Sequence, residues 1–350
     1  MAYPSEQTFG PQVRCAPQRS LLKAMGYTDF ELKDRPLIGI ASSWNTISPG
    51  HYNLNELADF VRKGIYAAGG TAVDFGVIAP CDGIPDATEG MKYILPSREV
   101  ICDAIELQTR TSMLDGLVLL GSCDKIVPGM LMAAARLNIP SILVSGGPML
   151  AGHFGGEEVS LSKTFEAVGA YKAGMMDEAT FYEAECNSCP GCGSCSYLGT
   201  ANTMCALAEA LGMTLPDGGT APATSAVRMM KAEETGVKIM ELVEKQITPS
   251  KILTPAAFKN AIIVHSAIGG STNGTIHLPS IARELGYDLP IELFDEINHQ
   301  VPHLGNINPS GTHLTEAFWF AGGVPMVQWL LRDMLDLDVM TVTGKTLGEN

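Results

Sequence analysis

The chain has 350 residues and a formal net charge of −15 at pH 7, and this length allows one large α/β domain or about two smaller ones. Such an acidic balance argues against nucleic acids and anionic membranes as partners. No stretch has the length and apolarity of a transmembrane helix, and residues 1–19 lack an apolar leader segment, so we expect a cytoplasmic protein.

Short apolar segments alternate with helical patterns along the first half of the chain. Residues 1–34 are expected to form an arm with a short helix at 19–25. After this arm we predict strands at 37–41, 71–78, 114–120 and 141–145. The intervening helices are predicted at 54–68, 97–111 and 130–137. This alternation is typical of an α/β fold, with a parallel or mostly parallel sheet flanked by helices.

The second half of the chain has a more helical pattern. We expect helices within 150–185, at 200–211, at 224–245 and from 275 onward, and a further strand at 261–267. The glycine-rich turn at 269–274 has backbone N–H groups that suit an anion. It matches neither the P-loop nor the G-x-G-x-x-G pattern, so nucleotide binding has weak support.

Polar side chains follow the second and third predicted strands directly. Asp82 comes after one strand, and Cys123, Asp124 and Lys125 come after the next. Because the carboxyl ends of parallel strands lie on one edge of a sheet, we expect the ligand loops to converge there. Two carboxylates suit a hard cation such as Mg²⁺. Lys125 has two open interpretations, as a counter-charge or, if carbamylated, as an oxygen ligand.

The chain has nine cysteines, an odd number that favours ligands or buried thiols over disulfides. Four of them are spaced C-x₂-C-x₂-C-x₂-C, at Cys186, Cys189, Cys192 and Cys195. This spacing is similar to that of a ferredoxin cluster loop, although the proline follows the second cysteine here. A zinc site lacks a second ligand pair. The simplest interpretation is that most of these thiols are structural and one or two are ligands.

Several motifs resemble the dihydroxy-acid dehydratase/phosphogluconate dehydratase family. The two most specific are CDKIVPGMLMAA at 123–134 and CPGCGSCS at 189–196, the latter followed by GTANTM at 199–204. The resemblance continues in order through LPSR at 95–98, SGGPM at 145–149, GGSTN at 269–273, VPHL at 301–304, PSG at 309–311, AGGVP at 321–325 and TVTGK at 341–345. It therefore covers nearly the whole chain.

This resemblance implies a hydro-lyase that converts a 2,3-dihydroxy acid to a 2-keto acid in branched-chain amino-acid biosynthesis. Its cofactors would be an iron–sulfur cluster, 2Fe-2S or 4Fe-4S, and Mg²⁺. By position, Cys123 and Cys195 would be cluster ligands. Asp82, Asp124 and a carboxylated Lys125 would hold the metal. The expected partners are a small dihydroxy acid and further copies of the chain, in a homodimer or higher homo-oligomer.

The sequence departs from the family pattern at two positions. Gly50 stands where many members have a third cluster cysteine, which leaves Cys81 or Cys192 as candidates. Thr88 stands where the family usually has a histidine.

The resemblance also implies a division of the chain. Residues 1–34 would be an arm, 35–340 the cofactor-binding domain, and 341–350 the start of a linker to a missing C-terminal domain. The family's serine base lies in that domain, so no catalytic base is expected here and the isolated chain would be inactive. The alternatives are a sugar-acid (aldonate) dehydratase of the same family and a non-catalytic iron–sulfur module. An electron carrier of the latter kind needs all four clustered cysteines.

Overall fold

The computed structural model describes residues 3–350 of the chain. Its centre is a four-stranded parallel sheet in the order β2-β1-β3-β4. The strands are β1 (Leu37–Ser42), β2 (Thr71–Gly76), β3 (Gly116–Gly121) and β4 (Ser141–Ser145). Strands β1, β3 and β4 are almost entirely buried and apolar, as expected for a sheet covered on both faces. The α/β fold predicted from the sequence is confirmed.

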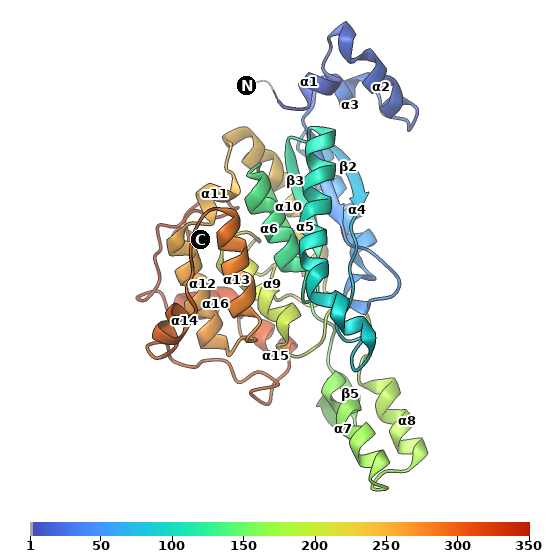
Figure 1. The fold of residues 1–350 in the computed structure, drawn as a ribbon, viewed down its shortest axis with the longest axis vertical. Coiled ribbons are helices and arrows are strands. Elements are labelled where there is room, and N and C mark those ends of the chain that lie inside the picture. The colour runs from blue at the N-terminus through green and yellow to red at the C-terminus, as the bar shows by residue number, and fades with distance from the viewer. Residues whose placement is uncertain (1–2) are drawn as a thin grey trace.

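Helices cover the sheet in pairs (Figure 1). Helices α4 (Leu54–Ala67) and α10 (Ala226–Lys245) pack together, and α10 also contacts β3 and β4. Helices α5 (Ile94–Ser112) and α6 (Ile126–Leu137) form a second packed pair, and α6 contacts the same two strands. Right-handed crossovers place the α4 connection on one face of the sheet and the α5 and α6 connections on the other.

The second half of the chain is a helical layer beside the sheet. It contains α9 (Thr200–Ala210), α11 (Pro249–Ile252), α12 (Pro255–Ile268), α13 (Gly274–Glu284), α14 (Ile291–Asn298), α15 (Thr315–Phe320) and α16 (Gly323–Leu330). Helix α9 packs on α6, and α12 packs on α9, α14 and α16. The apolar core is therefore continuous from the sheet into this layer.

The predicted strand at 261–267 is wrong, because these residues form the second half of α12. The helix begins at Pro255 after the cap residue Thr254, whose side chain accepts a hydrogen bond from the Ala257 N–H. It ends at Gly269, which has left-handed backbone angles. Nearly every residue from Ala261 to Ile268 is buried, and a helix buried all round shows the same unbroken apolar run as a buried strand.

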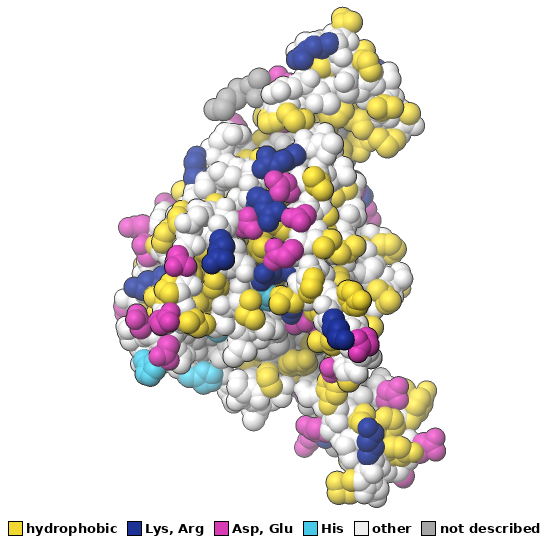
Figure 2. All heavy atoms as spheres, in the orientation of Figure 1, with side chains coloured by type: hydrophobic (Ala, Val, Ile, Leu, Met, Phe, Trp, Pro, Cys, Tyr) yellow, Lys and Arg dark blue, Asp and Glu magenta, His cyan; other side chains and the backbone are white. Residues whose placement is uncertain are grey.

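Two segments project from opposite ends of the body (Figure 1). One comprises the N-terminal helices α1 (Glu6–Phe9), α2 (Ala16–Lys23) and α3 (Asp29–Lys33), with a 3₁₀ turn, η1 (Val13–Cys15), so this arm is more helical than expected. The other comprises the hairpin β5 (Gly152–Phe154) and β6 (Glu157–Val159) with helices α7 (Leu161–Lys172) and α8 (Glu178–Asn187), where only helices had been expected. Both carry exposed apolar side chains (Figure 2).

The remaining elements are two short 3₁₀ helices, η2 (Pro49–His51) and η3 (Glu89–Tyr93). Over residues 3–350, none of the helices combines the length and the apolarity needed to cross a bilayer.

Candidate functional site

The loops after β1, β2 and β3 meet at the carboxyl edge of the sheet. The strand order is β2-β1-β3-β4, so β2 lies on one side of β1 and β3 lies on the other. The direction in which the chain adds strands to the sheet therefore reverses at β1. Open α/β sheets bind their ligands at such a switch point. The loops there carry Gly50, Asp82 and the segment 121–125.

Gly50 lies against the thiol of Cys123. A Cβ added to Gly50 would stand 2.5 Å from the Cys123 sulfur. Cys123 is buried and has a φ of 63°, a left-handed conformation in which non-glycine residues are strained. This turn ends β3 and orients the thiol toward the loops of the neighbouring strands.

Cys81 contacts Cys123 from the loop after β2. The hydrogen bond from Cys123, supported by backbone N–H groups of Gly83 and Ile84, lowers the pKa of Cys81 to about 6. The same hydrogen bond raises the pKa of Cys123, and burial adds to this effect. The pair therefore favours a thiolate on Cys81 and a thiol on Cys123.

Cys195 reaches the site from a different part of the chain. The Ser194 N–H donates to the Gly147 carbonyl at 3.0 Å, and the Met149 N–H donates to the Ser194 carbonyl at 2.8 Å. The Asn202 side chain donates to the Cys195 carbonyl at 2.5 Å. Burial is the main cause that raises the pKa of Cys195 to about 12, and the charges of Cys81 and Asp124 contribute to this shift. The segment after β4 thus brings this third thiol beside the other two.

The three charged residues predicted from the strand ends form one cluster. Nζ of Lys125 lies 2.8 Å from Oδ2 of Asp82 and 3.7 Å from Oδ2 of Asp124. Lys125 is buried and is the residue before the first turn of α6. Burial and the neighbouring Asp82 carboxylate raise the pKa of Asp124, while Lys125 opposes the shift. Asp82 Oδ1 is buried and accepts no hydrogen bond.

Sequence reasoning missed two residues of this site. The Thr200 hydroxyl at the start of α9 donates to Asp124. It also lies 3.0 Å from the Ser271 hydroxyl and accepts from Asn273 at 2.8 Å, which connects the glycine-rich turn to the acidic cluster. Tyr197 hydrogen-bonds Cys195. Tyr197 and Thr200 lie within five residues after Cys195 in the sequence, which is the one signal that pointed to them.

The remaining residues singled out in the sequence lie outside this cluster. Cys186 is exposed on α8 and contacts Tyr182, and Cys189 is also exposed. Thr88 is exposed and accepts from the Gly90 N–H at the start of η3. The four-cysteine run therefore does not form a compact group of four.

The side chains at the sheet edge provide ligand atoms for each of the two implied cofactors. Among residues 3–350, no three His, Cys, Asp or Glu side chains are grouped as ligands of a single metal ion. Mg²⁺ commonly takes only one or two carboxylates and keeps several waters, and the free Oδ1 of Asp82 beside Asp124 suits this pattern. Iron–sulfur clusters are held by cysteine thiolates, which the three neighbouring thiols provide. The residues fit both groups.

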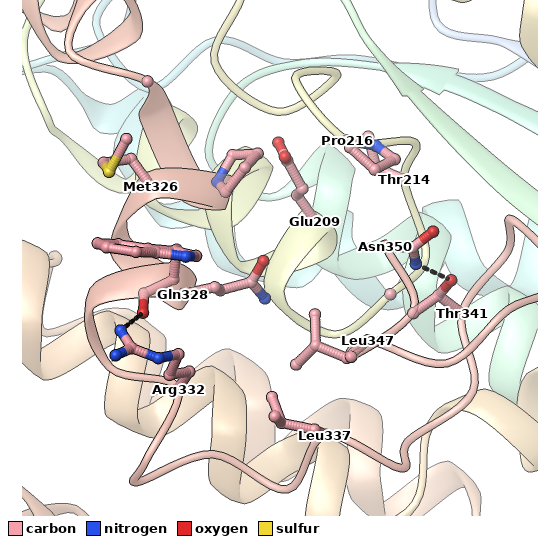
Figure 3. A pocket seen from close by; sticks show the side chains of 15 residues that line it. Glu209, Thr214, Pro216, Met326, Gln328, Arg332, Leu337, Thr341, Leu347 and Asn350 are labelled. Carbon is pink, nitrogen blue, oxygen red and sulfur yellow. Dashed lines mark hydrogen bonds between the residues drawn. The ribbon is translucent and has the colours of Figure 1, made fainter.

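A separate cavity lies between α9, α16 and the C-terminal residues (Figure 3). It encloses about 440 Å³ and is lined mainly by apolar groups, including Met326, Trp329 and Leu347. Glu209 and Arg332 are among its few charged lining residues. None of the thiols or carboxylates described above lines it, so it is separate from the site at the sheet edge.

The fold and site define an α/β protein with thiols and carboxylates gathered at the switch point of a parallel sheet. Residues 35–350 match the family model described as dihydroxy-acid/6-phosphogluconate dehydratase N-terminal, and the chain belongs to this family.

Curated relatives agree with this assignment. The dihydroxy-acid dehydratase of Caldanaerobacter subterraneus subsp. tengcongensis is 55% identical over 97% of this chain, and that of Caldicellulosiruptor bescii is 53% identical over 96%. The dihydroxy-acid dehydratase of Pyrococcus abyssi is 52% identical over 95%. In each case the chain spans 61% of the relative's length.

Proposed function

We propose that this chain is the cofactor-binding part of a dehydratase that converts a 2,3-dihydroxy acid to a 2-keto acid. The substrate we favour is 2,3-dihydroxy-3-methylbutanoate, which places the reaction in branched-chain amino-acid biosynthesis. The observation that carries the proposal is the contact of the Lys125 amine with Asp82 and Asp124 beside three thiols, in a chain of this family.

The charged residues would hold Mg²⁺, and the thiols would hold an iron–sulfur cluster. Asp82 and Asp124 would bind the metal ion through carboxylate oxygens, with Thr200 orienting Asp124 by its hydrogen bond. Cys123 and Cys195 would bind the cluster. When bound, these groups would supply Lewis acids that polarise the substrate's oxygen atoms.

Lys125 would take part as a carbamate. Its ammonium group would first lose one proton, and the neutral amine would then form an N–C bond with carbon dioxide and lose a second proton, so that a buried cation becomes an anion with two oxygen atoms. The carboxylates that now pair with the ammonium would then share the metal ion with the carbamate. In this reading the ion pair of the structure is the unmodified form of the site.

The test is 2-keto acid release by the protein from its complete reading frame, reconstituted with iron, sulfide, Mg²⁺ and bicarbonate. We expect turnover of 2,3-dihydroxy-3-methylbutanoate, and loss of turnover in Asp82→Asn. Asp86→Asn, an exposed residue of the same loop, is the matched control and should remain active. A panel of aldonates tests the sugar-acid alternative. A loaded protein that releases keto acid from none of these substrates would contradict the proposal.

We also propose that the protein self-associates. Val13, Leu21, Met25 and Phe30 of the N-terminal arm are all more than half exposed, which is a large apolar surface for a monomer (Figure 2). Light scattering should give a mass of at least two chains, and Leu21→Glu should lower it. A monomeric mass for the wild-type protein at micromolar concentration would exclude self-association.

A further inference from the structure

We propose that Cys81 is the third cysteine ligand of the iron–sulfur cluster, together with Cys123 and Cys195, and that Gly50 makes room for it. This inference rests on the proposed function, because it specifies the ligand set of the same site. It assigns the ligand role to a loop other than the one that carries position 50.

Position 50 has no space for a side chain in this structure. The Cβ of any other residue would stand 2.5 Å from the Cys123 sulfur and 3.5 Å from the backbone of Ser194. Gly146 also approaches this residue closely. A Cβ added to Gly146 would stand 2.9 Å from the Gly50 carbonyl oxygen. A thiol on this residue would therefore displace Cys123.

The strand order explains how Cys81 reaches the site. The loop that carries Gly50 follows β1, which lies between β2 and β3. The flanking loops carry Cys81 and Cys123. Because the central loop carries no side chain at position 50, the thiols from the two flanking loops meet across it and hydrogen-bond to each other. A bulkier residue on the central loop would fill the space next to Cys123.

The surroundings of the Cys81 sulfur match those of a metal-bound thiolate. It accepts hydrogen bonds from the N–H groups of Gly83 and Ile84 and from the Ser48 hydroxyl. Hydrogen bonds to the sulfurs are a recurring feature of iron–sulfur sites. The Ser48 hydroxyl also lies 3.9 Å from the Cys123 sulfur, so one loop contacts both thiols.

Cys192, the other candidate, lies in a different environment. It is partly exposed, and its pKa is raised mainly by burial, with a further contribution from the Glu56 carboxylate. The N–H of its neighbour Gly193 donates to the Pro49 carbonyl at 2.9 Å, which fixes this stretch beside the loop after β1. The contact with the Cys123 thiol thus favours Cys81.

The experiment compares cluster loading in Cys81→Ala and in the matched variant Cys192→Ala. Both are made in the complete protein and reconstituted anaerobically with iron and sulfide. The readouts are iron and acid-labile sulfide per chain, visible absorbance, and iodoacetamide labelling followed by mass spectrometry. Urea unfolding of the cluster-free proteins shows whether each variant folds.

We expect Cys81→Ala to lose most of its iron, or to hold a cluster with an altered spectrum, while Cys192→Ala loads like the wild type. In loaded wild-type protein, Cys81, Cys123 and Cys195 should be protected from labelling, and Cys192 should react. This labelling decides the question even if Cys81→Ala fails to fold.

Two results would overturn the inference, and they differ from each other. Wild-type iron content and spectrum in Cys81→Ala, or labelling of Cys81 in loaded wild-type protein, would reject Cys81 as a ligand and leave the proposed function standing. A folded wild-type protein that takes up no iron would reject the cluster itself, and the ligand assignment with it.

Discussion

The Lys125 ammonium lies 2.8 Å from the Asp82 carboxylate, and this ion pair joins the loops that follow β2 and β3. The side chains of Lys125 and Asp82 are only 8% and 23% exposed. Asp124 lies near the same ammonium, at 3.7 Å. A single cation therefore holds two carboxylates together in a site with little access to water.

Replacing Lys125 with methionine should destabilise the protein in a pH-dependent way. Burial and Asp82 raise the folded-state pKa of Asp124 above its ordinary value of 3.8, and loss of the lysine raises it further. A raised carboxyl pKa favours folding at low pH and opposes it as the pH rises. We expect a cost of about 3–5 kcal/mol at pH 8, as for a broken buried pair, and a smaller cost at pH 5.

Urea unfolding without metal measures this effect, with Lys63→Met as the control. Lys63 pairs with Glu233 at 2.7 Å on the surface, and such pairs contribute about 0–1 kcal/mol. An equal cost of Lys125→Met at both pH values would show that the two carboxylates do not interact through the lysine.

Gly50→Ala should destabilise the protein by about 1–3 kcal/mol, the usual effect of overpacking a filled site. The added Cβ would press on the Cys123 sulfur, and Cys123 is held in a tight turn. Gly76→Ala is the matched control, because a Cβ there has no neighbour within 4 Å. Equal midpoints for the two variants in urea would mean that the space at Gly50 is not filled.

Glu209 should make the folded state less stable as the pH rises. Burial raises its pKa to about 8 from 4.5, although its oxygens accept hydrogen bonds from the N–H groups of Asp217 and Gly219 at 2.8 and 2.7 Å. The group therefore favours folding fully below about pH 4.5 and loses this contribution as the pH approaches 8.

The free energy of unfolding of Glu209→Gln, measured against the wild type from pH 5 to pH 8, checks this expectation. The difference should shift in favour of the variant by a few kcal/mol over this range. A constant difference would show that Glu209 has the same charge in both states.

Thr254→Ala should cost about 1 kcal/mol, because it removes the side chain that caps α12. Thr111→Ala, on an exposed position near the end of α5, should change the free energy of unfolding by less than about 0.5 kcal/mol. Thermal or urea unfolding of both variants gives the comparison. The cap would be unimportant if the two changes were equal.

The sheet and its ligand edge were predictable because the four strands are short apolar runs that stop at polar residues. Asp82 and the segment 123–125 each follow such a run, and parallel strands fix on which edge they emerge. The run at 261–267 was misassigned because unbroken burial removes the periodicity that separates a helix from a strand. Thr254 and Gly269, as the two caps, carried the correct signal.

Other parts of the site depend on distances that no local pattern encodes. The contact between Cys81 and Cys123 requires the register of β2 and β3 on either side of β1. The bond between Thr200 and Asp124 requires α9 to pack on α6. Both pairs are far apart in the sequence, so only the folded chain reveals them.

The segment between Gly147 and Ser194 forms a structural module, because its two ends hydrogen-bond to each other. The chain leaves the sheet edge at Gly147, forms β5, β6, α7 and α8, and returns to hydrogen-bond its own point of departure. The entropy of closing such a loop grows only slowly with its length. The projecting helices can therefore grow, shrink or change their surface in the course of evolution without moving Cys195.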